Sequence, residues 1–339
     1  MEYQKVIQEI KRGQIQPLYF VYGSEQYLRQ SFIDQLLNQL DDSTELDISR
    51  FDYDEVSMDL ILDEAEMFSF FSDYRVIIVN QFELLTTTPN SKISDQEIKR
   101  LMAYIDDPNP ATYLIFIQHQ DKIDKRKKIS KAFQKKVMQV DVTPLEEKEV
   151  KYFIQTYIKE ANIDMTREAL TELLQRVGYQ LTQTMTELNK LATYAKSGQP
   201  ITVQTVRALV PRTLESDVFE LVNALIAKQV DKATQIYQDL LLLKNEPIAL
   251  HALIVSQFRI IIQTKILAQN GFQAASIAEQ LAIHPYRVQL ALQTGKSMSL
   301  KSLSTFYQSL VKADLQMKTG EGPKEIHFYM LLIRLIQMA

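Results

Sequence analysis

The first chemistry that the sequence suggests is phosphate binding, at Gly23–Gln30. Gly23 follows a short apolar run, Pro17–Tyr22, and precedes a helix-like stretch. A nucleotide-binding α/β domain places its phosphate loop at this point, with the pattern G-x-x-x-x-G-K-[ST]. In that pattern the glycines let backbone N–H groups surround the phosphates, the lysine reaches the terminal phosphates and the hydroxyl holds magnesium.

The chain departs from that pattern at its chemical positions. Leu28 stands where the second glycine belongs, Arg29 replaces the lysine and Gln30 lacks the hydroxyl. Glu25 adds a negative charge beside any bound phosphate, and the later apolar run ends in Gln118–Gln120 without an acidic residue for magnesium. We therefore expect neither ATP chemistry nor a catalytic residue nor a cofactor. An unrelated α/β domain with the same strand–glycine–helix turn is the alternative, because a single short motif is weak.

A second candidate site is apolar. Residues 56–71 favour a helix that ends in Met67, Phe68, Phe70 and Phe71. If the helix reaches Phe71, these side chains cannot all point into one core without crowding. They could form an exposed anchor for a partner protein, because large apolar side chains carry much of the energy of such contacts. The alternative is that the helix ends inside the core.

The densest basic stretch is Lys122–Lys136. Lys125, Arg126, Lys127 and Lys128 lie next to one another in it and could contact the phosphate backbone of DNA. A solvated helix face is the alternative interpretation, and it is the commoner origin of such a run.

A short break within Ala274–Leu292 resembles a helix-turn-helix. Its second helix offers only Arg287 as a cation for reading bases, so a plain helical corner is the preferred interpretation. A DNA-binding regulator and an active P-loop ATPase or kinase are therefore kept as alternative functions.

The elements that must position these residues fall into two kinds. Within 1–142, strand-like runs alternate with helical patterns, which predicts a parallel sheet covered on both faces. The predicted strands are Pro17–Tyr22, Leu46–Tyr53, Tyr74–Asn80, Thr112–Gln118 and Lys136–Val142. From residue 143 onward the apolar periodicity is helical. The prediction is three domains: an α/β domain over 1–142, a small helical domain over 143–212 and a helical bundle over 213–339.

Composition limits the remaining possibilities. The chain has 339 residues, 46% of them hydrophobic, with only 8 Gly and 10 Pro, as expected for a largely helical protein with a sizeable core. It has no Cys, and its four His show no ligand spacing, so we predict no metal site. The net charge of −4 argues against a protein devoted to gripping nucleic acid. A polar N-terminus and short apolar runs predict a cytoplasmic protein without membrane contact.

Five segments together resemble the delta subunit of the bacterial DNA polymerase III clamp loader. They are PLYFVYGSEQYL at 17–28, GYQLTQTMTELNKLATYA at 178–195, VFELVNALIAKQVDKA at 218–233, IAEQLAIHPYRV at 277–288 and KADLQMKTG at 312–320. No one of them is decisive, but together they span the whole chain, and their order and spacing are hard to match by chance.

The resemblance implies a degenerate AAA+ fold with a nucleotide-binding-like domain, a helical lid and a C-terminal collar. The altered loop then fits a subunit that does not hydrolyse ATP. The family's contact with the sliding clamp falls on Phe70 and Phe71, with Met67 and Phe68 as neighbouring candidates; Phe70 stands where the family also uses Leu. The implied partners are the clamp, the tau/gamma and delta prime subunits through the collar, and primed DNA, and the implied action is to open one clamp interface.

Overall fold

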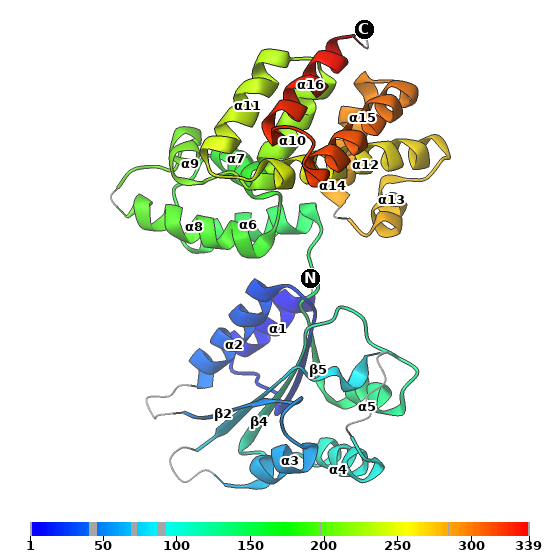
Figure 1. Cartoon of the computed structure of the whole chain (residues 1–339). Coiled ribbons are helices and arrows are strands. Elements are labelled where there is room, and N and C mark those ends of the chain that lie inside the picture. Colours follow the sequence, from blue (N-terminus) through cyan, green and yellow to red (C-terminus); the bar gives the residue numbers. More distant parts are fainter. Residues whose placement is uncertain are drawn as a thin grey trace. The chain divides into compact units, whose positions relative to one another are not determined.

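The computed structural model describes residues 2–40, 46–68, 73–86, 93–196, 198–283 and 285–337. The chain divides into two compact units, Met1–Leu145 and Glu146–Ala339. The first unit contains the strands and the second is helical (Figure 1).

Within the described residues, five strands form one parallel sheet in the order β2-β3-β4-β1-β5. The strands are β1 (Leu18–Tyr22), β2 (Asp47–Asp52), β3 (Arg75–Asn80), β4 (Thr112–Gln118) and β5 (Met138–Asp141). Each lies within or coincides with a predicted strand. The inner strands β1, β3 and β4 are apolar and almost wholly buried, as strands covered on both faces must be.

Helices cover both faces of the sheet. They are α1 (Glu2–Lys11), α2 (Gln26–Leu40), α3 (Met58–Glu66), α4 (Asp95–Asp106) and α5 (Lys128–Lys136). Helices α1 and α2 lie on one face, where the rings of Tyr19 and Phe32 are 5.1 Å apart; α3, α4 and α5 lie on the other (Figure 1). The latter face holds a core centred on Phe20, Phe82 and Phe133, whose rings pack together.

The second unit is helical, and its described residues include one isolated β-bridge, between Met165 and Ile201. In chain order its helices are α6 (Glu147–Glu160), α7 (Arg167–Val177), α8 (Leu181–Ala195), α9 (Val203–Leu209), α10 (Leu214–Ile226), α11 (Val230–Leu242), α12 (Pro247–Gln269), α13 (Ala274–Leu281), α14 (Pro285–Thr294), α15 (Leu300–Thr319) and α16 (Lys324–Gln337). The helices after residue 213 share one apolar core, which Leu250, Ile254, Phe258 and Ile261 of α12 enter. Helix α12 is long and apolar enough to cross a membrane, but these buried residues make it a core helix.

Two sequence interpretations change. The helix that begins after Ser57 ends at Glu66, so the version that carried it to Phe71 is wrong. Helices α13 and α14 pack through a small cluster of Ile277, Ala278 and Val288, as in a plain helical corner. The boundary between a lid and a collar inside the second unit stays a prediction.

Candidate functional site

In the loop after β1, three successive N–H groups donate to oxygens of the chain itself. The N–H of Gly23 donates to the carbonyl oxygen of Gln118 (3.0 Å), and the N–H of Glu25 donates to that of Val142 (2.9 Å). The N–H of Ser24 donates to the Asp121 carboxylate (2.8 Å), and the Ser24 hydroxyl donates to its other oxygen (3.3 Å). A carboxylate of the chain itself thus takes the loop N–H that an anion would need.

The three altered loop positions have structural roles. The Leu28 side chain is fully buried, so this position belongs to the core of the first unit. The Arg29 guanidinium donates to the carbonyl oxygen of Gly23 (3.2 Å) and thereby braces the turn. The Gln30 amide donates to Asp34 one turn further along α2 (2.8 Å). All three side chains thus pack against or bond to the chain itself.

The place where magnesium would be held is occupied by amide and imidazole groups. The buried Gln118 amide donates to the carbonyl oxygens of Gln120 (3.0 Å) and Lys122 (3.1 Å). Partial burial and the nearby Arg29 charge lower the pKa of His119. Across the part of the chain that the structure describes, no group of three or more His, Asp and Glu side chains could hold a metal ion.

At the opposite edge of the sheet, α3 ends in exposed apolar side chains. Its first turn is fixed by the Ser57 hydroxyl, which accepts from the N–H of Leu60 (3.3 Å). After Glu66 the chain becomes extended, and Met67 and Phe68 expose 56% and 75% of their surface. Two adjacent large apolar side chains in water are typical of a protein contact site.

The predicted pair at the clamp contact, Phe70 and Phe71, lies outside the described residues. The flanking candidates Met67 and Phe68 are described and exposed. Sequence reasoning therefore found an apolar tip, and the exact side chains of the contact stay a prediction.

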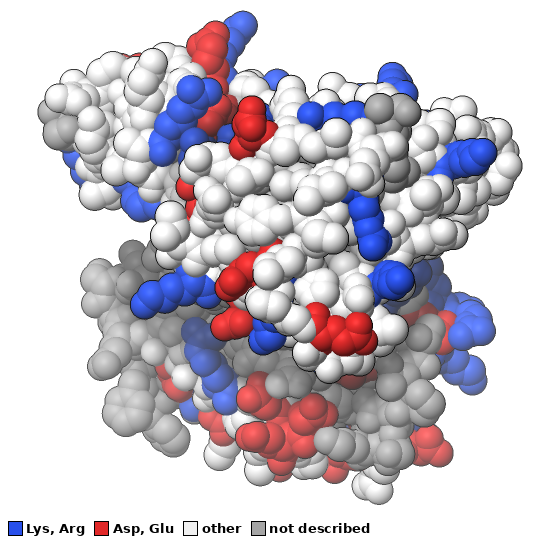
Figure 2. Space-filling view, turned by 45° about the horizontal axis from the view of Figure 1, so that its top comes forward, with Lys and Arg blue, Asp and Glu red and all other residues white. Residues whose placement is uncertain are grey.

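The basic stretch divides into engaged and free cations. Arg126 pairs with Asp124 (2.8 Å), and Lys127 donates to a backbone carbonyl just after β3 (2.9 Å). Lys125 and Lys128 are exposed and form no hydrogen bond or ion pair within the described residues. On the face that Figure 2 shows, Lys and Arg are interspersed with Asp and Glu among many uncharged residues. That face has no broad basic surface of the kind that grips a duplex.

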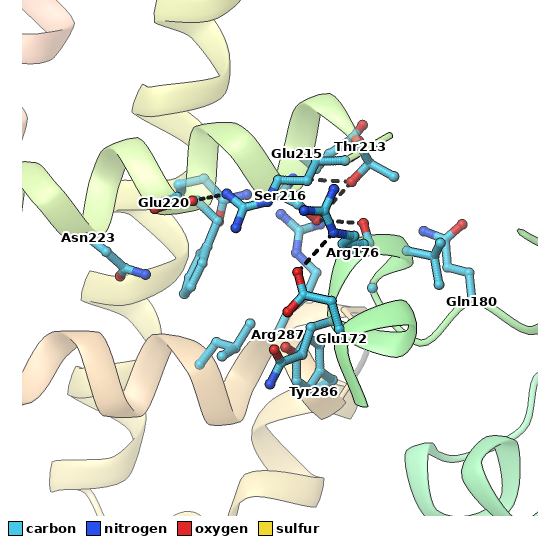
Figure 3. A pocket seen from close by; sticks show the side chains of 17 residues that line it. Glu172, Arg176, Gln180, Thr213, Glu215, Ser216, Glu220, Asn223, Tyr286 and Arg287 are labelled. Atoms are coloured by element: carbon cyan, nitrogen blue, oxygen red, sulfur yellow. Dashed lines mark hydrogen bonds and ion pairs between the residues drawn. The ribbon is translucent and has the colours of Figure 1, made fainter. Parts of the chain in front are cut away.

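Sequence reasoning missed a pocket of about 380 Å³ between α7, α10, α12 and α14 (Figure 3). Its polar groups largely satisfy one another: Arg176 pairs with Glu172 (2.9 Å) and donates to the carbonyl oxygen of Val210 (2.8 Å), and Ser216 donates to the carbonyl oxygen of Arg176 (3.2 Å). These contacts join α7 to the start of α10. Arg287 is half-buried in the pocket wall, which does not suit a side chain that must reach bases in a groove.

The fold defines an AAA+-like protein, and its loop after β1 lacks the second glycine, the lysine and the hydroxyl of the phosphate-binding pattern. Models of the DNA polymerase III delta subunit match residues 19–143, and models of its C-terminal domain match 215–335; a model described as a middle domain matches 146–208.

Two relatives and one solved structure agree. DNA polymerase III subunit delta of Bacillus subtilis (strain 168) is 32% identical over 98% of this chain and 96% of the relative. A probable subunit delta of Aquifex aeolicus (strain VF5) is 23% identical over 88% of this chain and 85% of the relative. The Bacillus subtilis DNA clamp loader delta protein (YqeN) superposes with a TM-score of 0.78 and covers 99% of both chains. This chain belongs to the DNA polymerase III delta subunit family, a family of clamp-loader components, and no catalytic activity is indicated for it.

Proposed function

We propose that this chain is the subunit that binds the sliding clamp and opens one of its interfaces, so that the clamp can be loaded on primed DNA. The observation that carries the proposal is the pairing of an inert loop with an exposed apolar tip in the same unit. In the loop, the N–H groups of Gly23, Ser24 and Glu25 donate to the chain's own oxygens, which supports a subunit that does not itself hydrolyse ATP. The tip offers side chains that bind by burial.

The action proposed is mechanical. Phe70 and Phe71, or the adjacent Met67 and Phe68, enter an apolar pocket on the clamp, and each buried phenylalanine contributes about 1.5–3 kcal/mol. A ligand shifts a conformational equilibrium only through its different affinities for the two states. The tip therefore opens the clamp if its pocket fits better when the clamp interface is strained. Hydrolysis of ATP in sister subunits then releases the clamp.

The helical bundle over 213–339 is the proposed collar that binds the tau/gamma and delta prime subunits. One side of α16 supports this. Its buried side packs in the bundle core, while the other side exposes an apolar row at helical spacing: Ile326, Met330, Ile333 and Ile336. Such a row on a soluble protein is typical of a subunit interface. Residues 143–212 are the proposed lid.

Contact with DNA is proposed to be local. Among the four adjacent cations, Lys125 and Lys128 form no hydrogen bond or ion pair within the described residues and are the proposed phosphate contacts, whereas Arg126 and Lys127 already have partners. Contacts by so few cations suit a subunit that meets DNA only inside a complex, in the cytoplasm.

The test is equilibrium binding of the purified chain to the sliding clamp of its own host. The variants are Phe70→Ala/Phe71→Ala and Met67→Ala/Phe68→Ala. The control is Leu242→Ala/Leu243→Ala, which removes two equally exposed apolar side chains from the other unit. We expect one of the tip variants to bind at least about 100-fold more weakly, because two buried apolar side chains are lost. The control should bind like the unmodified chain.

The possible outcomes distinguish a wrong function from a wrong choice of contact residues. Absence of clamp binding by the unmodified chain would contradict the proposed function. Equal binding by both tip variants would keep the clamp as partner but overturn the assigned contact residues. ATP turnover by the isolated chain would favour the ATPase alternative instead.

A further inference from the structure

Helix α3 has no local stop signal. Neither glycine nor asparagine follows Glu66; Met67 occupies the cap position with an extended backbone (φ −74°, ψ 143°). The last carbonyl groups of a helix have no N–H partner inside the helix, so other groups must satisfy them. Something outside the helix must therefore determine where α3 ends.

The partners are side chains at the start of β3 and β4 and in the loop that precedes β4. The Thr112 hydroxyl donates to the carbonyl oxygen of Ala65 (3.0 Å), and the Asn109 amide donates to the same oxygen (3.1 Å). The Arg75 guanidinium donates to the carbonyl oxygen of Glu64 (3.1 Å). These two carbonyls would otherwise bond to N–H groups at positions 68 and 69 if the helix continued.

The donors are themselves held in place by the sheet. Thr112 and Arg75 are the first residues of β4 and β3 and are direct neighbours in register; Asp47, the first residue of β2, completes the row. The Arg75 guanidinium pairs with Asp47 (2.8 Å) and with the Glu64 carboxylate (2.9 Å). Arg75 and Thr112 are buried, and a buried polar group is unfavourable unless it is bonded. Their bonds to α3 therefore satisfy the buried donors of Arg75 and Thr112 as well as the last carbonyl groups of the helix.

We infer that Thr112, Asn109 and Arg75 are positioning residues for the contact that the apolar tip makes with its protein partner. By occupying the carbonyls of Glu64 and Ala65 they stop α3 and set the direction in which Met67 and Phe68 leave it. A contact segment whose base is fixed loses less conformational freedom on binding, which improves affinity without adding any contact. The inference rests on the proposed clamp-binding function and names residues that do not themselves touch the clamp.

Three single substitutions test this with the full chain and the host's sliding clamp. Thr112→Val removes the hydroxyl at constant shape, and Thr112→Ser keeps it. Thr264→Val is the matched control, because Thr264 is fully buried in the other unit and its hydroxyl has no partner within the described residues. Loss of one buried hydrogen bond predicts about three- to tenfold weaker clamp binding for Thr112→Val. Thr112→Ser and Thr264→Val should bind within about twofold of the unmodified chain.

A fourth variant separates positioning from general stability. Val140→Ala makes a hole beneath β5, the far edge strand of the same sheet, and should lower the thermal unfolding temperature at least as much as Thr112→Val does. We expect it to leave clamp affinity unchanged. If Val140→Ala and Thr112→Val both weaken clamp binding in proportion to their loss of unfolding temperature, Thr112 acts only through general stability and the inference is wrong.

The remaining outcomes are distinguishable. Equal affinities for Thr112→Val and the unmodified chain would overturn this inference and leave the proposed function intact. Equally weak binding by Thr112→Val and Thr112→Ser would exclude the hydroxyl as the cause and also overturn it. If the unmodified chain binds no clamp, the proposed function fails and this inference fails with it.

Discussion

The two edges of the parallel sheet present opposite kinds of surface. At the carboxyl edge, after β1, the loop N–H groups bond to the chain's own oxygens, and Leu28 is buried. At the amino edge, the carbonyls of α3 are also satisfied internally, by Thr112 and Arg75. There, however, the next two side chains are apolar and exposed.

The difference lies in which groups are left for a partner. At the carboxyl edge, the N–H groups of Gly23, Ser24 and Glu25 are already engaged by the chain's own oxygens. At the amino edge the last carbonyl groups of α3 are also hydrogen-bonded, but the Met67 and Phe68 side chains are exposed. Exposed apolar side chains suit binding by burial. The two edges of one sheet therefore differ in what they offer: engaged backbone donors at one, exposed apolar side chains at the other.

The largest expected effect comes from restoring the motif at the carboxyl edge. The triple variant Leu28→Gly, Arg29→Lys, Gln30→Ser recreates the chemical letters of a working loop. We expect it to lose about 3–5 kcal/mol of unfolding free energy, because a buried leucine is deleted and glycine enters a helix. ATP turnover should stay at background, since Asp121 still accepts from Ser24. Denaturant unfolding measures the loss of stability, and a phosphate-release assay measures ATP turnover. Turnover above background would mean that the carboxyl edge can still bind a nucleotide.

A smaller effect is expected from Gly23→Ala. A Cβ atom there would lie 2.3 Å from the Val142 carbonyl group, and the φ of +132° is one that side chains rarely adopt. We expect a loss of about 2–4 kcal/mol by denaturant unfolding. The control is Gly178→Ala, at a left-handed helix end with nothing within 4 Å of the new atom, which should lose only about 1 kcal/mol. Similar losses for the two variants would mean that Gly23 is needed only for its positive φ and not for its close approach to Val142.

The smallest effect concerns pH and the start of α3. Glu97 accepts from the N–H groups of Ser94 (2.8 Å) and Met58 (3.1 Å), and these hydrogen bonds lower its pKa, the Ser94 N–H most of all. A lowered carboxyl pKa means that the contribution is present above about pH 4.5 and is lost as pH falls through the folded-state pKa. Glu97→Gln should cost about 0.5–1 kcal/mol at pH 6 and less at pH 3. A gap between variant and unmodified chain that widens on acidification would contradict this sign.

Much of the first unit could be predicted from local pattern. The run Thr112–Gln118 is apolar throughout, and the strand it predicts has the same bounds as β4. The departure from the phosphate-loop pattern can be read directly from the sequence, at Leu28, Arg29 and Gln30. The prediction could not show that Asp121 takes the Ser24 N–H, since that bond joins residues 97 positions apart.

The end of α3 was mispredicted for a physical reason. Its sequence permits a helix to Phe71, and the donors that stop it come from Thr112 and Asn109, more than forty residues away. The pocket around Arg176 was missed for the same kind of reason, because Glu172 is a local helical partner but Val210 and Ser216 are not. Tertiary hydrogen bonds of this type leave no periodic trace in the sequence.

The burial of Leu28 also bears on how such a subunit could evolve. A side chain that had merely blocked a phosphate could be reversed by one substitution. A side chain that has become part of the core cannot, because any reversal first passes through a destabilised protein that still lacks activity. Position 28 therefore ties the loop to the core: glycine there would destabilise the fold before a lysine and a hydroxyl at positions 29 and 30 could bring any nucleotide chemistry.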